Sequence, residues 1–325
     1  MIRIHLTPED LAETRFAFSP VWEAVQSVEA LSNPGKYVFH LPWIDRARVA
    51  ARDLDLEPLR ALLSYPHGYR ADFVTPPPDG PYPDFEEELQ RILATPSDIV
   101  RREVAMTYPD GDMPRAARAF IDDPEGSVRR LTETLRAYWD ATLAEHWPRL
   151  RALLEGDVLY RAKRLALEGA EGLFGDIHPS VTWSDGVLTV DKRWEADVVP
   201  GGRGLLLIPV AFSCPKCSVI SDPPWQPTLV YTPRAIATLW DTDRAPADGV
   251  LDELVGETRA AILRALEIPM TTTEMASRLG VTPGAVSQQL SVLRRAGVVD
   301  AHRSGRGVYS ELTPLGQSLV GLLDG

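Results

Sequence analysis

Polar side chains suited to nucleic-acid contact follow a helical spacing near the end of this 325-residue chain. The apolar residues Val286, Leu290 and Leu293 recur at i, i+4 and i+7, which predicts a helix with one buried face. Ser and Gln side chains can hydrogen-bond base edges or phosphates, and a glycine near a helix N-terminus lets a DNA backbone come close. The residues expected on the outer face are Thr282, Gly284, Ser287, Gln288, Ser291, Arg294 and Arg295.

A local excess of positive charge supports the same chemistry. The whole chain has a formal net charge of -12, yet the segment from Arg278 to Arg306 holds five Arg against a single acidic residue, Asp300. Such a patch predicts an anionic partner, here double-stranded DNA. His302, Arg303 and Arg306 lie beyond the helix, where a turn brings them within reach of phosphate or the minor groove.

The elements that position these residues have clear boundary signals. Thr271 precedes Glu274 by three residues, the spacing of a capping box, and the helix that it opens ends at Gly280. A Thr-Pro pair at 282–283 begins the second helix, and a Gly-rich turn at 304–307 joins two short strands. With a helix before and after them, these elements predict a C-terminal winged helix-turn-helix.

The preceding residues show a different pattern, with helical spacing first and strand-like alternation afterwards. We therefore expect an α+β fold, a mainly helical N-terminal domain with a small antiparallel sheet. The expected helices cover 8–15, 20–31, 45–63, 84–94 and 123–154, the last kinked near Pro148. The expected strands are a hairpin at 181–190 and single strands at 204–212 and 228–232. A Pro-containing stretch at 244–249 predicts the boundary between an N-terminal sensor or dimerisation domain, 1–248, and a DNA-binding domain, 249–325.

Cys214 and Cys217 form a Cys-x-x-Cys pair, a spacing that can hold zinc or cycle as a dithiol. Lys216 between them would favour the thiolate. A closed zinc site needs four ligands, and the sequence has no second such pair, although His178 or a second subunit could complete it. We interpret the pair as small residues near a strand end and keep a redox or zinc sensor as the alternative.

No catalytic motif stands out in the chain. Gly-x-Ser-x-Gly, Walker and zinc-protease signatures are absent, and GGRG at 201–204 lacks the third glycine of a dinucleotide fingerprint. The chain is therefore not expected to be an enzyme. An N-terminal enzyme domain with an attached winged helix is the alternative.

We interpret most of the Trp residues as core filling and expect Trp225, which lies between prolines, at the edge of a pocket or interface.

The stretch AVSQQLSVLRRAGVV, residues 285–299, resembles the recognition helix of ArsR/SmtB-type bacterial repressors, and the wing followed by TPLG matches too. The resemblance implies a dimeric winged-helix transcription regulator in which Ser287, Gln288 and Gln289 contact DNA. Gln289 stands where the family often has His, and the family's Cys-x-Cys motif is absent, so its metal specificity does not carry over. Residues 1–249 resemble the large N-terminal domain of some ArsR-like regulators, in the stretches RFAFSPVWE, GGRGLLLIPVAF and DPPWQPTLVY.

Composition completes the expectation. The longest apolar run, 205–212, is too short for a membrane span, and two cysteines make no disulfide framework, so we expect a cytoplasmic protein without a membrane partner. We expect it to act as a homodimeric repressor on an operator of two half-sites, without a cofactor. A small-molecule effector sensed by the N-terminal domain would release the operator.

Overall fold

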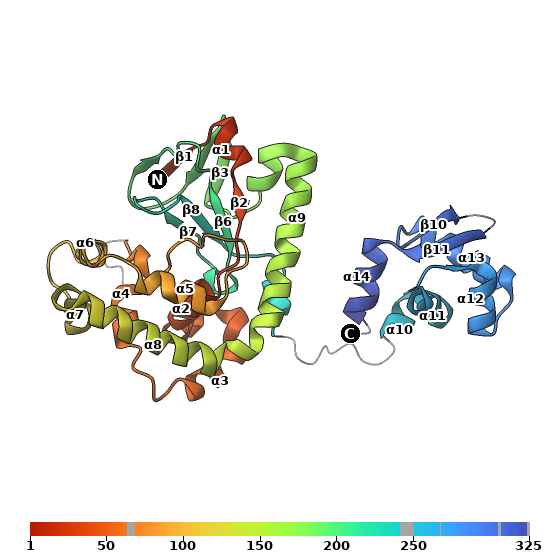
Figure 1. Ribbon diagram of the computed structural model, residues 1–325, viewed down its shortest axis with the longest axis horizontal. Coiled ribbons are helices and arrows are strands. Elements are labelled where there is room, and N and C mark those ends of the chain that lie inside the picture. The colour runs from red at the N-terminus through yellow and green to blue at the C-terminus, as the bar shows by residue number, and fades with distance from the viewer. Residues whose placement is uncertain (64–68, 241–249, 267, 305–306, 324–325) are drawn as a thin grey trace. The chain divides into compact units, whose positions relative to one another are not determined.

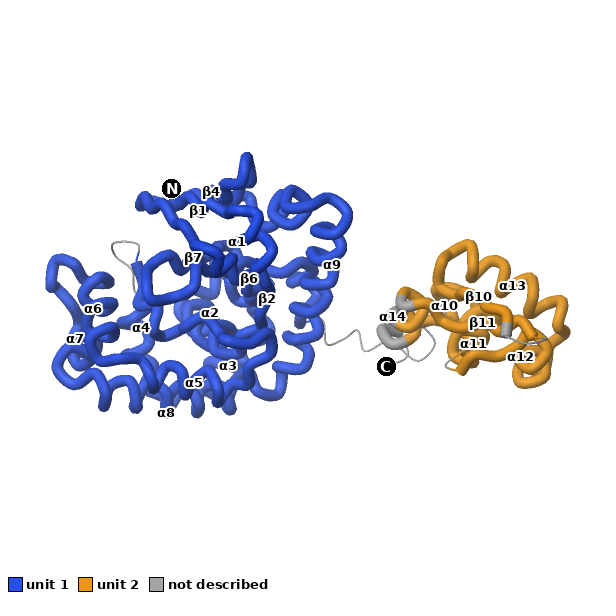
Figure 2. The backbone as a smooth tube through the Cα atoms, turned by 45° about the horizontal axis from the view of Figure 1, so that its top comes forward, with its two compact units in different colours: residues 1–240 blue, residues 241–325 orange. Residues whose placement is uncertain are grey.

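The computed structural model describes residues 1–63, 69–240, 250–266, 268–304 and 307–323. The chain divides into two compact units, unit 1 (Met1–Trp240) and unit 2 (Asp241–Gly325), shown in Figure 2. The predicted boundary between residues 248 and 249 falls in a segment outside the described residues and stays a prediction.

Unit 1 has a helical half and a strand-rich half (Figure 1). Its helices are α1 (Pro8–Ala12), α2 (Pro20–Ser32), α3 (Leu41–Ala50), α4 (Glu57–Leu63), α5 (Phe85–Leu93), α6 (Ser97–Thr107), α7 (Arg115–Asp122), α8 (Pro124–Thr142) and α9 (Trp147–Phe174). Helix α2 is buried on almost every side, because α3, α4, α5 and α8 pack around it. Burial of its apolar side chains removes them from water, which makes α2 the centre of the helical core.

The strands of unit 1 form two four-stranded sheets. One has the order β3 (Val181–Ser184), β4 (Val187–Val190), β1 (Ile2–His5) and β5 (Ala196–Val198). The other has the order β2 (Arg15–Phe16), β6 (Leu206–Pro209), β8 (Thr228–Tyr231) and β7 (Ser218–Ile220). Both are mixed: β1 is antiparallel to β4 and parallel to β5, whereas β8 is parallel to β6 and antiparallel to β7.

The α+β class is confirmed, and so is the hairpin at 181–190, with Asp185 and Gly186 at positive φ in its turn. The strands form two small mixed sheets in place of a single antiparallel one. The N-terminal strand β1 inserts between two strands almost 190 residues away in the chain, which no local pattern can indicate. Strand β6 is shorter than expected, because the amides of Ala211 and Phe212 donate to the buried carboxylate of Glu23 and turn the chain.

Two of the predicted helices are each two helices in the structure, and a proline lies in the first turn of the second one. Residues 45–63 form α3 and α4, and Pro58 lies in the first turn of α4. Residues 123–154 belong to α8 and α9, and Pro148 lies in the first turn of α9 rather than at a kink. A proline fits the first turn because its missing N–H would have no intrahelical partner there.

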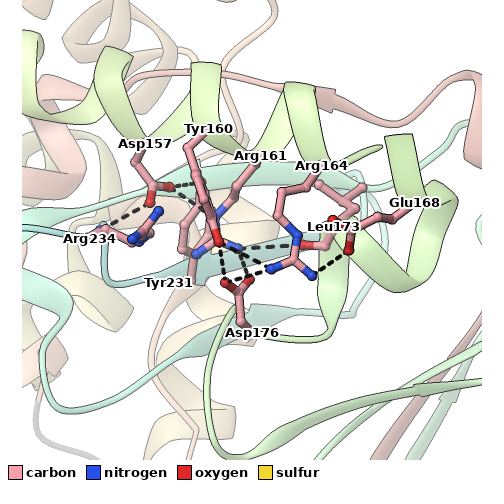
Figure 3. A network of polar contacts seen from close by, with 9 residues as sticks. All are labelled: Asp157, Tyr160, Arg161, Arg164, Glu168, Leu173, Asp176, Tyr231 and Arg234. Carbon is pink, nitrogen blue, oxygen red and sulfur yellow. Dashed lines mark hydrogen bonds and ion pairs between the residues drawn. The ribbon is translucent and has the colours of Figure 1, made fainter. Parts of the chain in front are cut away.

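A buried polar network fastens α9 to the end of β8 (Figure 3). The Asp157 carboxylate accepts hydrogen bonds from the Tyr231 hydroxyl (2.8 Å), Arg161 Nε (2.9 Å) and the Arg234 backbone N–H (3.0 Å). Arg161 also pairs with Asp176, at 3.1 Å. Asp157 and Arg161 are 3% and 1% exposed, so each needs these partners to offset its desolvation.

Unit 2 contains α10 (Val250–Val255), α11 (Glu257–Ala265), β9 (Met270–Thr271), α12 (Thr272–Leu279), α13 (Pro283–Arg295), β10 (Val299–Ser304), β11 (Gly307–Leu312) and α14 (Pro314–Leu323). Its own apolar core joins residues of α11, α12 and α13. Among the described residues of the whole chain, no helix is both long enough and apolar enough to cross a membrane.

Candidate functional sites

Helices α12 and α13 form a helix-turn-helix with well-defined ends. Thr271 Oγ1 accepts from the Glu274 N–H, and the Glu274 carboxylate accepts from the Thr271 N–H, which completes the predicted capping box. Gly280 ends α12 at φ 68°, a left-handed conformation that favours glycine. Thr282 caps α13 by accepting from the Ala285 N–H, at 3.3 Å.

The inner face of α13 is apolar, as its spacing predicts. Val286, Leu290 and Leu293 are at most 3% exposed and pack in the core of unit 2. This packing fixes the rotation of the helix and turns the opposite face outward.

The outer face of α13 presents polar side chains that the protein itself leaves free. Ser287, Gln288, Ser291 and Arg295 are exposed, and none of them has a side-chain partner among the residues that the structure describes. Free donors and acceptors at this spacing match what base edges and phosphates require. These four residues are the strongest of the predicted DNA contacts on geometric grounds.

Other predicted residues have partners within unit 2. Gln289 Oε1 accepts from Arg259 Nε at 2.9 Å, which ties α13 to α11. Arg294 donates to Oγ of the buried Ser310, at 2.9 Å, and so links α13 to β11. The sequence did not indicate Arg259 as a partner of α13, because a single arginine on α11 has no spacing pattern that identifies the residue it contacts.

Gly284 lies in the first turn of α13, where an added Cβ would have no neighbour within 4 Å. Glycine costs roughly 1 kcal/mol relative to alanine inside a helix. Neither backbone conformation nor packing within the described chain calls for it, so its exposed position agrees with the prediction of close approach by a partner.

The wing consists of β10 and β11, and β9 pairs with β11 to complete a three-stranded sheet. His302 stacks on Tyr309, with ring centroids 6.1 Å apart, and its Nδ1 lies 3.5 Å from a Glu311 carboxylate oxygen. Arg303 is exposed. Arg306 lies outside the described residues.

Cys214 and Cys217 are both free thiols, the first partly buried and the second buried. Burial raises the pKa of the Cys214 thiol, which opposes thiolate formation. The ammonium of Lys216, between the two cysteines, lies 2.6 Å from the Glu29 carboxylate. His178 contacts Ser180 Oγ (2.7 Å) and the Pro215 carbonyl (3.2 Å). Over the part of the chain that the structure describes, no three His, Cys, Asp or Glu side chains are grouped to hold a metal ion.

Unit 1 also contains a pocket of about 660 Å³ that the sequence did not indicate. Its lining comes from helix α2, Lys36, Leu63 at the end of α4, residues 69–75, residues 191–194 and the segment through β7. Trp22 and Trp194 belong to it. Trp225 lines a different pocket, as expected, and donates its indole N–H to the buried Glu103, at 2.7 Å. The lining residues come from segments that lie far apart in the chain, so no single stretch of sequence marks the pocket.

Two family models match parts of the chain. A family described as "Helix-turn-helix domain" matches residues 256–302, and a "Family of unknown function (DUF5937)" matches residues 101–236. No curated protein and no solved structure matches. The first match covers α11, α12, α13 and the start of the wing, and so includes the helix that presents the free polar face. The chain therefore carries a C-terminal helix-turn-helix domain of the kind found in DNA-binding transcription regulators, preceded by a DUF5937 segment.

Proposed function

We propose that this protein is a homodimeric transcriptional repressor of the ArsR type that binds an operator of two half-sites. The observation that supports this most directly is the outer face of α13, where Ser287, Gln288, Ser291 and Arg295 are exposed and free of partners among the described residues. In this proposal α13 enters the major groove and Arg303 of the wing approaches the phosphates. Occupation of the promoter by the protein then blocks transcription.

Electrostatics favours one orientation on DNA. The chain as a whole is acidic, with a net charge of -12, so a polyanion is repelled from most approaches. Arg295 and Arg303 offer local positive charge on unit 2, and each phosphate contact would release condensed counterions. Binding should therefore weaken as salt rises.

The dimer contact in this proposal is the exposed face of α9. Leu159 is 72% exposed there, and Ala152, Glu155, Lys163 and Ala166 recur on the same side at steps of three and four. If a second copy of α9 packs antiparallel about Leu159, Glu155 of one copy lies opposite Lys163 of the other, and Ala152 lies opposite Ala166. This self-complementary pattern supports a two-fold contact between copies of the chain. Helix α9 runs along the outside of unit 1, as Figures 1 and 2 show.

We further propose that unit 1 senses a small molecule in the 660 Å³ pocket. A volume of this size suits a drug-sized ligand. Strand β7 lines the pocket and pairs with β8, whose end is held to α9 by Asp157. A ligand that favours one arrangement of these elements would change the dimer contact, and with it the fit of two recognition helices to two half-sites.

The test is binding of the purified protein to DNA from upstream of its own gene, compared with random DNA of equal length over a salt series. A preference of about a thousandfold or more, with affinity that falls steeply as salt rises, is the expected outcome. A promoter fusion then tests repression, because transcription should rise when the gene is deleted. Equal and weak binding to both DNAs would contradict the proposal.

A second candidate, catalysis by unit 1, is favoured by one observation. Tyr69 and Asp72 line the pocket and hydrogen-bond each other, and burial raises the pKa of both groups. Perturbed groups in a pocket are a feature of active sites. We nevertheless propose a binding role. Mass spectrometry of a ligand that releases the operator separates the two, because a sensor returns it unchanged and an enzyme does not.

A further inference from the structure

The pocket of unit 1 gathers positive charge in an acidic chain. Five cationic residues line it, against the carboxyl groups of Asp72 and Asp191: they are Lys36, Arg70, Lys192, Arg193 and Lys216. Burial, followed by the charge of Glu103, raises the pKa of Asp72 well above its ordinary value, so this group offsets little of the positive charge. The pocket therefore has an excess of positive charge.

Three of the cations are held close together by the fold. Arg70 donates to Ser218 Oγ at 2.9 Å and lies 3.7 Å from Glu29, which also pairs with Lys216 at 2.6 Å. Lys192 donates to the Cys217 carbonyl. Burial lowers the pKa of Lys192, and the nearby charges of Arg70 and Lys216 lower it further. Glu29 therefore lies between two of these three cations, Arg70 and Lys216.

The other two cations are available for a ligand. Lys36 and Arg193 are exposed, and neither side chain has a hydrogen bond or ion pair with any described residue. Because they lie in the pocket lining without a protein partner, an incoming anion can pair with them at no loss of existing contacts.

Apolar and aromatic side chains make up much of the remaining lining. Trp22 and Val25 of α2, Val219 and Ile220 of β7, and Trp194 all belong to it. Flat apolar surfaces of this kind favour a ring or hydrocarbon body, and aromatic side chains add stacking contacts. Cations and aromatic residues together select a ligand that has both an anionic group and an apolar body.

We propose that this pocket binds an organic anion with a flat apolar body, such as an aromatic carboxylate, with Lys36 and Arg193 pairing with the anionic group and Trp22 and Trp194 contacting the apolar body. The assignment of this anion as the effector rests on the proposed function, whereas its binding to unit 1 does not. The ligand would lie against β7, which connects through β8 and Asp157 to α9.

The test uses two probes that share one ring system and differ by a charged sulfonate, on the full-length protein. One is the anion 8-anilinonaphthalene-1-sulfonate, and the other is uncharged N-phenyl-1-naphthylamine. Fluorescence titration should show that the wild-type protein prefers the anion. The double variant Lys36→Gln, Arg193→Gln should bind the anion about tenfold more weakly, because the sulfonate loses its ion pairs with these two exposed cations. It should bind the uncharged probe as well as the wild type does. The matched control is Arg52→Gln with Arg115→Gln, two exposed arginines that do not line the pocket, and it should bind both probes as the wild type does.

A pocket-filling variant, Val219→Trp, should weaken both probes, and circular dichroism would establish that it is folded. Equal affinity of the wild-type protein for the two probes, or an anion preference that survives in the Lys36→Gln, Arg193→Gln variant, would overturn the proposal. Organic carboxylates that displace the anionic probe are then tested on the protein–DNA complex. A wild-type protein that binds the probe but no operator would refute the proposed function and leave the anion site standing.

Discussion

The Tyr231 hydroxyl donates a hydrogen bond to the Asp157 carboxylate at 2.8 Å, and this contact joins the last strand of unit 1 to its longest helix (Figure 3). Asp157 is 3% exposed, so the donors around it offset the cost of its burial. The chain continues from Tyr231 through Arg234, whose backbone N–H also donates to Asp157. A movement of β8 would therefore strain or break its hydrogen bonds to Asp157 of α9.

Removal of the Tyr231 hydroxyl should destabilise unit 1. Tyr231→Phe leaves the buried Asp157 carboxylate with one donor fewer, and we expect a loss of about 1–3 kcal/mol in the free energy of unfolding. Urea denaturation followed by Trp fluorescence measures it, because every Trp lies within residues 1–240. Tyr160→Phe is the matched control: that hydroxyl donates to the half-exposed Asp176 and should matter much less. Equal losses in the two variants would show that burial of the network is unimportant.

Arg295 and Arg294 are neighbours on α13 that should behave differently. Arg295 is free among the described residues, so Arg295→Gln should weaken binding to specific and random DNA alike and reduce the slope of log affinity against log salt by about 1. Arg294→Gln should also lower the stability of unit 2, by roughly 1 kcal/mol, because Arg294 donates to the buried Ser310. Thermal unfolding and salt titrations of both variants check this. An unchanged salt slope for Arg295→Gln would place Arg295 away from DNA.

Gln288 should affect specificity rather than general affinity. Its amide is exposed and has no partner in the described part of unit 2. If it contacts a base edge, Gln288→Ala loses about 1–3 kcal/mol of binding to the operator and little to random DNA. Gln317→Ala, an exposed glutamine of α14, is the control. The preference for operator over random DNA, measured at one salt concentration, decides the matter, and an equal loss on both DNAs would make Gln288 a phosphate contact.

The α9 face should set the oligomeric state. Leu159→Glu introduces charge at the centre of the proposed contact and should convert a dimer to a monomer in sedimentation velocity, whereas Val49→Glu on α3, at a residue 66% exposed, should not. A charge exchange is the sharper experiment. Glu155→Lys and Lys163→Glu should each weaken the dimer, and the two together should restore it, because the proposed antiparallel contact pairs these positions. A dimer indifferent to all these changes would place the contact elsewhere.

The sequence predicted unit 2 well because its signals are local. The capping box at Thr271 and the glycine at 280 mark helix ends within a few residues, and the spacing of Val286 and Leu290 sets the buried face. Partners such as Arg259 for Gln289 could not be predicted, because side-chain pairing between helices depends on how they pack. The free face of α13 was thus predictable, while the division of its residues into free and paired ones was not.

Unit 1 was predicted only in outline, because its contacts join distant segments. Strand β1 pairs with β4 and β5, so its sheet closes only when the two ends of the unit meet. The pocket has the same origin: Lys36 and Arg193 are far apart in sequence, and nothing near either residue indicates a shared site. Contacts between residues far apart in the chain form both the sheet and the pocket, and such contacts produce no periodic pattern in the sequence.

His40 should make the stability of unit 1 depend on pH. It is fully buried, accepts a hydrogen bond at Nδ1 from the Trp240 indole (2.8 Å) and contacts the Ala211 carbonyl through Nε2 (3.1 Å). Those partners suit the neutral imidazole with its proton on Nε2, and burial lowers the pKa of His40 to about 4. Because the unfolded chain takes up this proton near the ordinary value of 6.5, stability is fully present above about pH 6.5 and is lost as pH falls towards about 4.

The size of the His40 effect and its cause can both be measured. The free energy of unfolding should fall by about 3 kcal/mol between pH 6.5 and about pH 4 because of this one group. Urea denaturation by Trp fluorescence over the range should show a steeper decline for the wild type than for His40→Gln, whatever the other titrating groups contribute. Trp240→Phe removes the hydrogen bond to Nδ1 but keeps the ring buried, so the decline should persist at a lower overall stability. If His40→Gln declines as steeply as the wild type, His40 is not the titrating group, and if Trp240→Phe loses the decline, the hydrogen bond rather than burial holds the imidazole neutral.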